Sequence, residues 1–252
     1  MTEFGVYHDV KTAYRHSGSG QDMILLHGWG ESKDHMKQIE NHYRERCSVY
    51  NLDFPGFGES GLPPVPWGVP DYRDFLKDFI DAHGIQDPVL IGHSFGCRVA
   101  IRYAAEYGHV RKMVLTGAAG LRLNAPKQSR LKSSIFKAGK TLLTVTGNEK
   151  ALEALRDRHG SEDYRNAKGV MRETFVKVVN DDVRELLPKV KCPVLLVFGD
   201  RDTATPIEAG RIMAAEMPDA GLAVFEGDDH WAFLHQAARF NTVMDIFFQG
   251  DL

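Results

Sequence analysis

Cysteine is scarce in this chain, and long apolar runs are missing. The 252 residues include three cysteines, Cys47, Cys97 and Cys192, which form neither a CxxC pair nor an even disulfide set. We therefore expect reduced, buried thiols and a reducing, cytoplasmic location. No stretch has the length of a membrane span, and the N-terminus carries no apolar segment of the secretory type.

Sequence signals for metals, cofactors and nucleic acids are also missing. The chain has no HExxH, no paired CxxC and no carboxylate cluster at metal-ligand spacing, so we expect no metal site. Gly56-Phe57-Gly58 lacks the third glycine of a dinucleotide fingerprint and is interpreted as a turn. No basic run is interleaved with aromatic residues, which argues against a nucleic-acid partner.

Charge is distributed unevenly, although the net charge is only −3. Residues 121–191 hold 16 of the 31 Lys and Arg but 9 of the 34 Asp and Glu. Solvated helix faces on an inserted segment would explain this excess. The alternative is a basic surface that attracts an anionic substrate.

Strand-like and helix-like segments alternate along most of the chain. After a short leading hairpin, helical spacing predicts helices at residues 33–44, 71–83, 207–217 and 232–248. Apolar runs predict buried strands at residues 22–26, 48–52, 88–91, 112–116, 193–198 and 222–225. This alternation predicts an α/β fold with a doubly wound, mostly parallel sheet.

Residues 121–188 depart from that alternation. They contain helical patterns at 131–143, 150–158 and 170–179 but no evident strand. We interpret them as a helical cap, or lid, inserted into a core domain formed by residues 1–120 and 189–252. Such a cap would cover the carboxyl edge of the sheet, where open α/β sheets bind ligands.

The segment Gly92-His93-Ser94-Phe95-Gly96 lies between an apolar strand and an amphipathic helix. A G-x-S-x-G in that setting is typical of a nucleophile elbow, which raises the serine hydroxyl above the sheet. The N–H group that follows the serine then lies at a helix N-terminus, where it can stabilise negative charge. Ser94 is therefore the candidate nucleophile.

A serine nucleophile needs a base, and the base needs an orienting group. Asp200 and Asp202 follow the strand at 193–198, and His230 follows the last strand. All three therefore lie at the same edge as Ser94, in the chain order associated with this elbow. His235 competes as the base, but it lies farther inside the predicted last helix.

These segments together resemble the α/β-hydrolase superfamily over nearly the whole chain. The resemblance implies that Asp202 is the acid, because it stands three residues after a glycine in a GxxD pattern. It also implies an oxyanion hole formed by the backbone N–H groups of Trp29 and Phe95. The matching segments are HGWG at 27–30, DFPGFGES at 53–60, GHSFG at 92–96, GDRDTATP at 199–206 and DDHW around His230.

The resemblance also limits the candidates for the catalytic acid and for the class of reaction. Some relatives place the acid after the preceding strand, but residues 117–120 read GAAG and offer no carboxylate. Dehalogenases and epoxide hydrolases of this superfamily use aspartate at the elbow, and Ser94 argues against both.

Several nearby residues are expected to have structural roles. We expect Asp228 and Asp229 to shape the loop of His230, and His27 to form hydrogen bonds beneath the oxyanion loop. His93 either borders the pocket or supports the elbow.

The sequence therefore predicts a serine hydrolase that forms an acyl-enzyme and needs no cofactor. The expected partner is a small-molecule acyl substrate: a small to medium carboxylic ester, a thioester or a lactone, anionic if the basic cap faces it. Met171 and Phe175 are among the apolar cap residues that could contact it. Two alternatives stay open. One is a carbon–carbon bond hydrolase of a ring-cleavage dienoic ketone acid, and the other is a receptor-like ligand-binding protein on the same fold.

Overall fold

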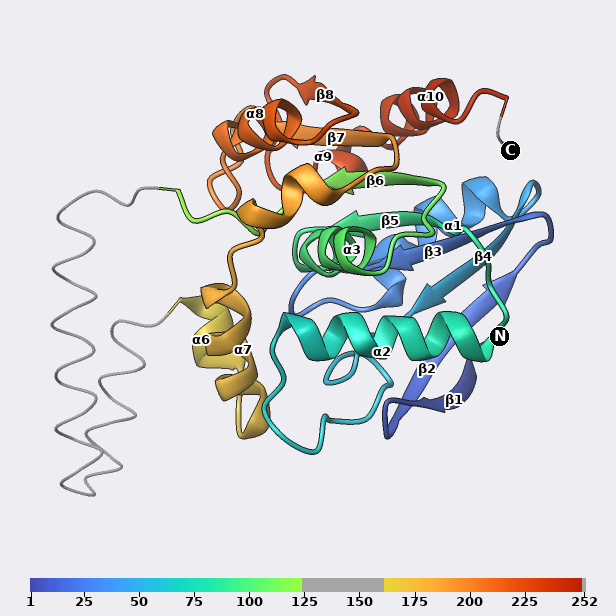
Figure 1. Ribbon diagram of the computed structural model, residues 1–252, viewed down its shortest axis with the longest axis vertical. Helices are drawn as coiled ribbons and strands as arrows, with labels where there is room; N and C mark the ends of the chain where they lie inside the picture. Colours follow the sequence, from blue (N-terminus) through green and yellow to red (C-terminus); the bar gives the residue numbers. More distant parts are fainter. Residues whose placement is uncertain (124–160, 251–252) are drawn as a thin grey trace, which may run out of the picture.

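A computed structural model describes residues 1–123 and 161–250, and its centre is an eight-stranded sheet (Figure 1). The strands follow the order β1-β2-β4-β3-β5-β6-β7-β8 across the sheet. Their bounds are β1 (Glu3–Tyr7), β2 (Val10–Ser17), β3 (Gln21–Leu26), β4 (Cys47–Leu52), β5 (Val89–His93), β6 (Lys112–Thr116), β7 (Val194–Gly199) and β8 (Ala220–Phe225).

Six of these strands form a parallel array, and β1 and β2 join it in antiparallel pairs. Every residue of β4, β5 and β7 is buried. Strands that are covered on both faces need apolar residues at nearly every position, which is why these segments are apolar runs instead of alternating patterns.

Helices cover both faces of the sheet. One apolar cluster joins it to α2 (Val69–Ala82), α3 (Phe95–Glu106) and α8 (Ile207–Glu216). The other joins it to α1 (Lys37–Tyr43), α9 (Ala232–His235) and α10 (Ala237–Phe247). The prediction of a doubly wound, mostly parallel sheet is confirmed.

Two helices predicted as continuous begin with a separate short helix. A 3-10 helix, η1 (Lys33–Met36), precedes α1, and its first N–H, that of Lys33, donates to Asp53 Oδ1 at 2.6 Å. The last helix is interrupted at Gln236, whose backbone has φ −111° and ψ 46°. The side-chain amide of Gln236 donates to Asp228 at 2.9 Å.

The chain leaves the sheet after β6 and returns to it at β7, its direct neighbour. The described part of this excursion contains α6 (Glu162–Asn166), α7 (Val170–Asn180) and η2 (Arg184–Lys189). α6 and α7 lie beyond the ends of β5 and β6 to which the arrows point in Figure 1, whereas η2 packs against α3 and α8. The Val183 N–H donates to the Gly120 carbonyl at 2.9 Å and closes the excursion. The predicted helices at 131–143 and 150–158 lie outside the described residues, so the division into core and cap stays a prediction.

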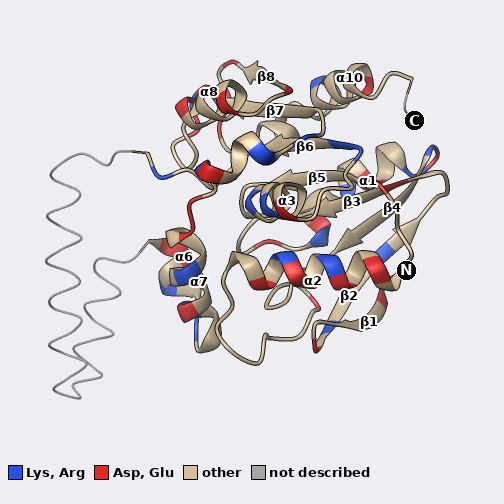
Figure 2. Ribbon diagram, in the orientation of Figure 1, with Lys and Arg blue, Asp and Glu red and all other residues tan. Residues whose placement is uncertain are grey.

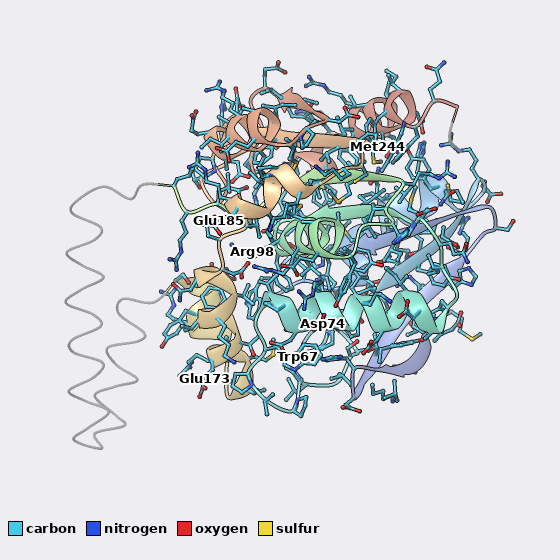
Figure 3. The ribbon with its side chains drawn as sticks, viewed as in Figure 1. Trp67, Asp74, Arg98, Glu173, Glu185 and Met244 are labelled. Atoms are coloured by element: carbon cyan, nitrogen blue, oxygen red, sulfur yellow. The ribbon has the colours of Figure 1, made fainter. Side chains whose placement is uncertain are left out.

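Two residues outside this excursion bind it directly, one through its side chain and one through its backbone N–H. The buried guanidinium of Arg98, on α3, donates to the Val178 carbonyl at 2.6 Å (Figure 3). The Thr174 hydroxyl of α7 accepts from the Trp67 N–H at 3.0 Å. These bonds hold α7 against the carboxyl edge of the sheet.

Both signs of charge occur on α6 and α7 (Figure 2). Much of the basic excess of residues 121–191 falls on residues 124–160, outside the described part of the chain. Within the described part, no helix combines the length and apolar character that crossing a membrane would require.

Candidate active site

Ser94 occupies a strained turn between β5 and α3, with φ 49° and ψ −108°. A positive φ is costly for a residue with a Cβ and is typical of a functional turn. Two glycines make room for the turn. A Cβ added at Gly96 would lie 2.1 Å from the Leu26 carbonyl oxygen, and one at Gly92 would lie 2.8 Å from the Cys97 nitrogen. The elbow therefore requires both glycines.

Asp202 lies in the turn after β7 and is 5% exposed. Its Oδ2 is 2.7 Å from His230 Nδ1 and accepts from the Thr205 hydroxyl at 2.6 Å. Its Oδ1 accepts from the backbone N–H groups of Ala204 and Thr205, both at 2.8 Å. Burial alone would raise the pKa of Asp202, but the hydrogen bonds from His230 and Thr205 hold it below its usual value. The carboxylate is therefore ionised and fixed in direction.

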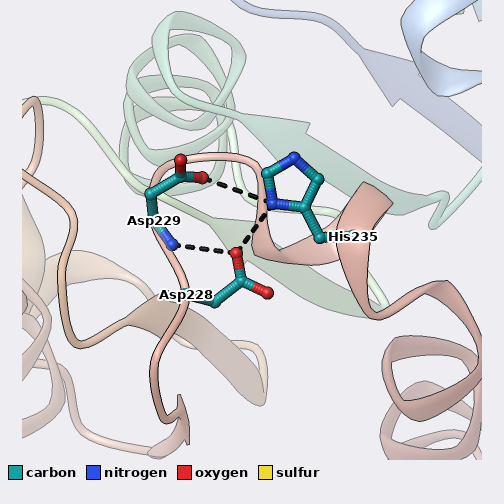
Figure 4. A group of neighbouring side chains, drawn as sticks. All are labelled: Asp228, Asp229 and His235. Atoms are coloured by element: carbon teal, nitrogen blue, oxygen red, sulfur yellow. Dashed lines mark hydrogen bonds and ion pairs between the residues drawn. The ribbon is translucent and has the colours of Figure 1, made fainter.

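Asp200 and His235, the two competitors, lie elsewhere. Asp200 is exposed and accepts from the Gly227 N–H at 2.7 Å. His235 Nδ1 is 2.8 Å from Asp228 Oδ1 (Figure 4). The structure thus brings Asp202, and not Asp200, to His230.

His230 lies beside the elbow. Its ring centroid is 4.7 Å from that of His93, the residue before Ser94. A Cβ added at Gly117, just after β6, would lie 2.9 Å from His230 Nδ1. No hydrogen bond joins the Ser94 hydroxyl to His230 among the residues that the structure describes, and in unliganded sites this bond often tightens only when substrate binds.

Trp29 and Phe95 approach the elbow from two elements. Phe95 is the first residue of α3, so its N–H has no acceptor within the helix. Trp29 lies in the turn after β3, which the Glu31 N–H closes onto the Gly28 carbonyl at 3.3 Å. The two rings are 5.6 Å apart, edge to face.

A cleft of about 610 Å³ opens beside Trp29 and Trp231, the neighbour of His230. Its volume is within the range of small-molecule sites. Partial desolvation raises the pKa of Asp163 at this cleft, and the charges of Glu162 and Glu31 add to the effect. The lining residues are Trp29, Gly30, Glu31, His35, Gly56, Phe57, Leu62, Asp163, Asn166, Ala167, Lys168, Met171 and Trp231.

A family comparison agrees with this fold. The profile of the alpha/beta hydrolase family matches residues 23–243. The chain belongs to this family.

Named relatives of this alpha/beta hydrolase include esterases. A pimeloyl-(acyl-carrier protein) methyl ester esterase of Chromobacterium violaceum is 27% identical over 240 residues, which cover 88% of this chain and 92% of the relative. An uncharacterized protein of Mycobacterium tuberculosis is 23% identical over 274 residues, covering 97% and 80%.

Solved structures share the fold. An esterase from Exiguobacterium antarcticum matches with a TM-score of 0.78 and 20% identity, covering 99% of this chain and 100% of that one. A meta-cleavage product hydrolase from Pseudomonas fluorescens matches with a TM-score of 0.75 and 22% identity, covering 98% and 97%.

Two residues beside the site escaped the sequence analysis. The Thr205 hydroxyl lies 3.1 Å from His230 Nδ1 as well as bonding Asp202. Its position in the turn after the GxxD pattern is the signal that could have identified it. Glu31 is buried in the turn at residues 27–31, which carries the predicted oxyanion donor Trp29 and is called the oxyanion turn below; the sequence gives no comparable signal for Glu31.

His27 connects the oxyanion turn to the loop after β4. Its Nδ1 donates to the Gly28 carbonyl at 2.7 Å, and its Nε2 accepts from the Phe54 N–H at 2.9 Å. Burial lowers the pKa of His27, which keeps the ring neutral in this arrangement.

Asp228, Asp229 and His235 form a cluster whose ligand-type atoms lie within 4.8 Å of one another (Figure 4). Internal bonds already use these atoms. Asp228 Oδ1 accepts from the Asp229 N–H at 2.9 Å as well as from His235, and its Oδ2 accepts from Gln236. The cluster connects the loop before His230 to α9.

Cys97, directly behind the elbow, is fully buried, and its burial raises the pKa of the thiol well above the usual value. A thiol in that state is a poor nucleophile.

Proposed function

We propose that this alpha/beta hydrolase cleaves small to medium carboxylic esters with Ser94 as nucleophile, His230 as base and Asp202 as the orienting acid. The observation that carries the proposal is the 2.7 Å hydrogen bond between His230 Nδ1 and Asp202 Oδ2. An ionised Asp202 accepts the Nδ1 proton, so the other ring nitrogen, Nε2, is free to act as a base.

The reaction proceeds in two halves. His230 takes the proton of the Ser94 hydroxyl while Oγ attacks the ester carbonyl, and Asp202 stabilises the imidazolium. The N–H groups of Trp29 and Phe95 stabilise the tetrahedral oxyanion, each by about 3 kcal/mol. The alcohol leaves with the proton from His230. Water, deprotonated by the same ring, then attacks the acyl-enzyme and releases the acid.

The cleft favours a neutral acyl chain. Trp29, Phe57 and Met171 supply apolar walls, whereas Glu31 and Asp163 would repel a carboxylate. Lys168 is the basic residue of this lining. The methyl ester named for the curated relatives fits the same class. Since α6 and α7 contribute several of these residues, we propose that residues 121–188 act as the lid of the site.

Hydrolysis of p-nitrophenyl esters from acetyl to dodecanoyl tests this proposal. We expect turnover with a peak along the series, and a loss of at least about 10³-fold in Ser94→Ala. Ser17→Ala, at the end of β2, removes a serine hydroxyl away from the site and serves as the matched control.

Substantial turnover by purified Ser94→Ala would contradict the mechanism. Absence of turnover in the wild-type protein would favour one of the two alternative functions, a carbon–carbon bond hydrolase or a receptor-like ligand-binding protein. Loss of absorbance of a ring-cleavage product would favour the first, and ligand-induced thermal stabilisation without turnover would favour the second.

A further inference from the structure

Glu31 lies between the oxyanion turn and the elbow, with 8% of its side chain exposed. Its Oε2 accepts a hydrogen bond from the Gly28 N–H at 3.0 Å, and its Oε1 is 3.2 Å from His93 Nε2. The contact is close, since a Cβ added at Gly28 would lie 2.2 Å from Oε1. One carboxylate thus contacts both segments that supply the oxyanion donors.

His93 extends this contact toward the base. Its side chain is fully buried, and Nδ1 donates to the Thr116 carbonyl at 3.2 Å. Nε2 forms no hydrogen bond with the residues that the structure describes and lies at ion-pair distance from Glu31. Its ring lies 4.7 Å from His230 and 4.7 Å from Phe233, and it directly precedes Ser94 in the chain. The ring is therefore held on several sides.

Glu31 remains ionised in this position. Burial would raise its pKa, but His93 and the Gly28 N–H lower the pKa below its ordinary value. A buried charge that keeps two partners is costly to disturb, because loss of either partner leaves a polar group without compensation. The Gly28 N–H belongs to the peptide unit between His27 and Gly28, so its bond to Glu31 fixes the backbone directly before the unit that carries the Trp29 N–H.

We propose that Glu31 is a positioning residue that holds the oxyanion turn and the nucleophile elbow in their reactive arrangement. It acts through Gly28 on the Trp29 N–H and through His93 on the segment that carries Ser94. This role rests on the proposed serine mechanism.

The test compares Glu31→Ala with Glu31→Gln. Alanine removes the acceptor of the Gly28 N–H, so we expect kcat to fall between about 10- and 100-fold with KM changed by less than about 2-fold. Glutamine retains an oxygen for the Gly28 N–H and an amide facing His93, and we expect it to recover kcat to within about 5-fold of wild type.

A trifluoromethyl ketone with the preferred acyl chain separates positioning from general loss of stability. Its adduct with Ser94 places an oxyanion in the hole, so its inhibition constant should rise by the same factor as kcat/KM falls. Glu40→Ala is the matched control, because Glu40 is also a buried carboxylate but pairs with Arg15. We expect it to lower thermal stability and to leave inhibitor affinity unchanged.

Wild-type inhibitor affinity in Glu31→Ala would overturn the proposal, and so would equal losses of kcat in the alanine and glutamine variants. If Glu31→Ala does not fold, Glu31→Met fills the space without an acceptor and replaces it in the comparison. Ser94→Ala is measured in parallel. Residual turnover in Ser94→Ala would refute the serine mechanism and, with it, the role of Glu31. If turnover requires Ser94 but Glu31→Ala keeps wild-type kcat, only the role of Glu31 is refuted.

Discussion

Replacing Asp202 with asparagine would place the wrong hydrogen-bonding atom against His230. The N–H groups of Ala204 and Thr205 both donate to Oδ1, at 2.8 Å, so they will hold the amide oxygen of the asparagine on that side. The amide nitrogen then occupies the position of Oδ2, 2.7 Å from His230 Nδ1. Because this nitrogen is a donor, His230 must turn its Nδ1 into an acceptor and carry its proton on Nε2. A ring in that state cannot take the proton of Ser94.

We expect Asp202→Asn to lower kcat by about 10⁴-fold at neutral pH, the size of effect that the wrong tautomer causes in serine hydrolases with this arrangement. This corresponds to about 5.5 kcal/mol of transition-state stabilisation. The measurement is kcat and KM for the preferred p-nitrophenyl ester, with KM expected to stay near its wild-type value because Asp202 does not touch substrate.

Two controls accompany this variant. Asp200→Asn makes the same chemical change two residues away, where the carboxylate bonds only Gly227 among the described residues, and should keep kcat within about 2-fold. Asp202→Ala removes the carboxylate without imposing a tautomer, so its loss should not exceed that of asparagine. A loss below about 10-fold in Asp202→Asn would refute the reasoning.

Two further predictions concern stability. Lys33 is 2% exposed and its ammonium pairs with the fully buried Asp53 at 2.7 Å, so Lys33→Met should lower the free energy of unfolding by about 3–5 kcal/mol in urea denaturation. A change below about 1 kcal/mol would contradict this. The hydrogen bond with Asp228 raises the pKa of His235, so the stabilisation it provides is present below about pH 6.5 and is lost as pH rises through the raised pKa. His235→Gln should therefore lower Tm at pH 5.5 more than at pH 8.5, and the free energy of unfolding should change by less than about 1 kcal/mol because the His235 side chain is 53% exposed. A gap in Tm that widens with rising pH would exclude this contribution.

The parts of the fold that were predictable from sequence depend on local patterns. Strands buried on both faces, such as β5 and β7, are continuous apolar runs, and the glycines around Ser94 follow from the close approach of β3 and α3. Each of these sequence patterns, the apolar runs and the glycines of the elbow, spans about ten residues or fewer and can be recognised without knowledge of distant contacts.

The partners of polar groups were harder to predict because they come from distant segments. Asp200 and Asp202 are two residues apart, and only the turn that bonds Oδ1 of Asp202 decides which one faces His230. Gln236, where the last helix is interrupted, bonds Asp228 on the other side of the loop of His230. Glu31 follows β3 and lies beside His93, at the end of the neighbouring strand β5. Neither residue type in the sequence indicates this contact by itself.

The hydrogen bond from Val183 to Gly120 joins the two ends of the excursion between β6 and β7. The chain between them behaves as a loop whose ends are already fixed, and the entropy of closing such a loop rises by only about 0.6 kcal/mol for each doubling of its length. Insertions or deletions between those two residues would therefore change the closure entropy little, provided that the bonds of α7 to Arg98 and Trp67 are kept. The elements that carry Ser94, Asp202 and His230 all lie outside this loop. Under the proposed mechanism, a change in this segment would therefore alter the range of accepted substrates without rebuilding the elements that carry the proposed triad.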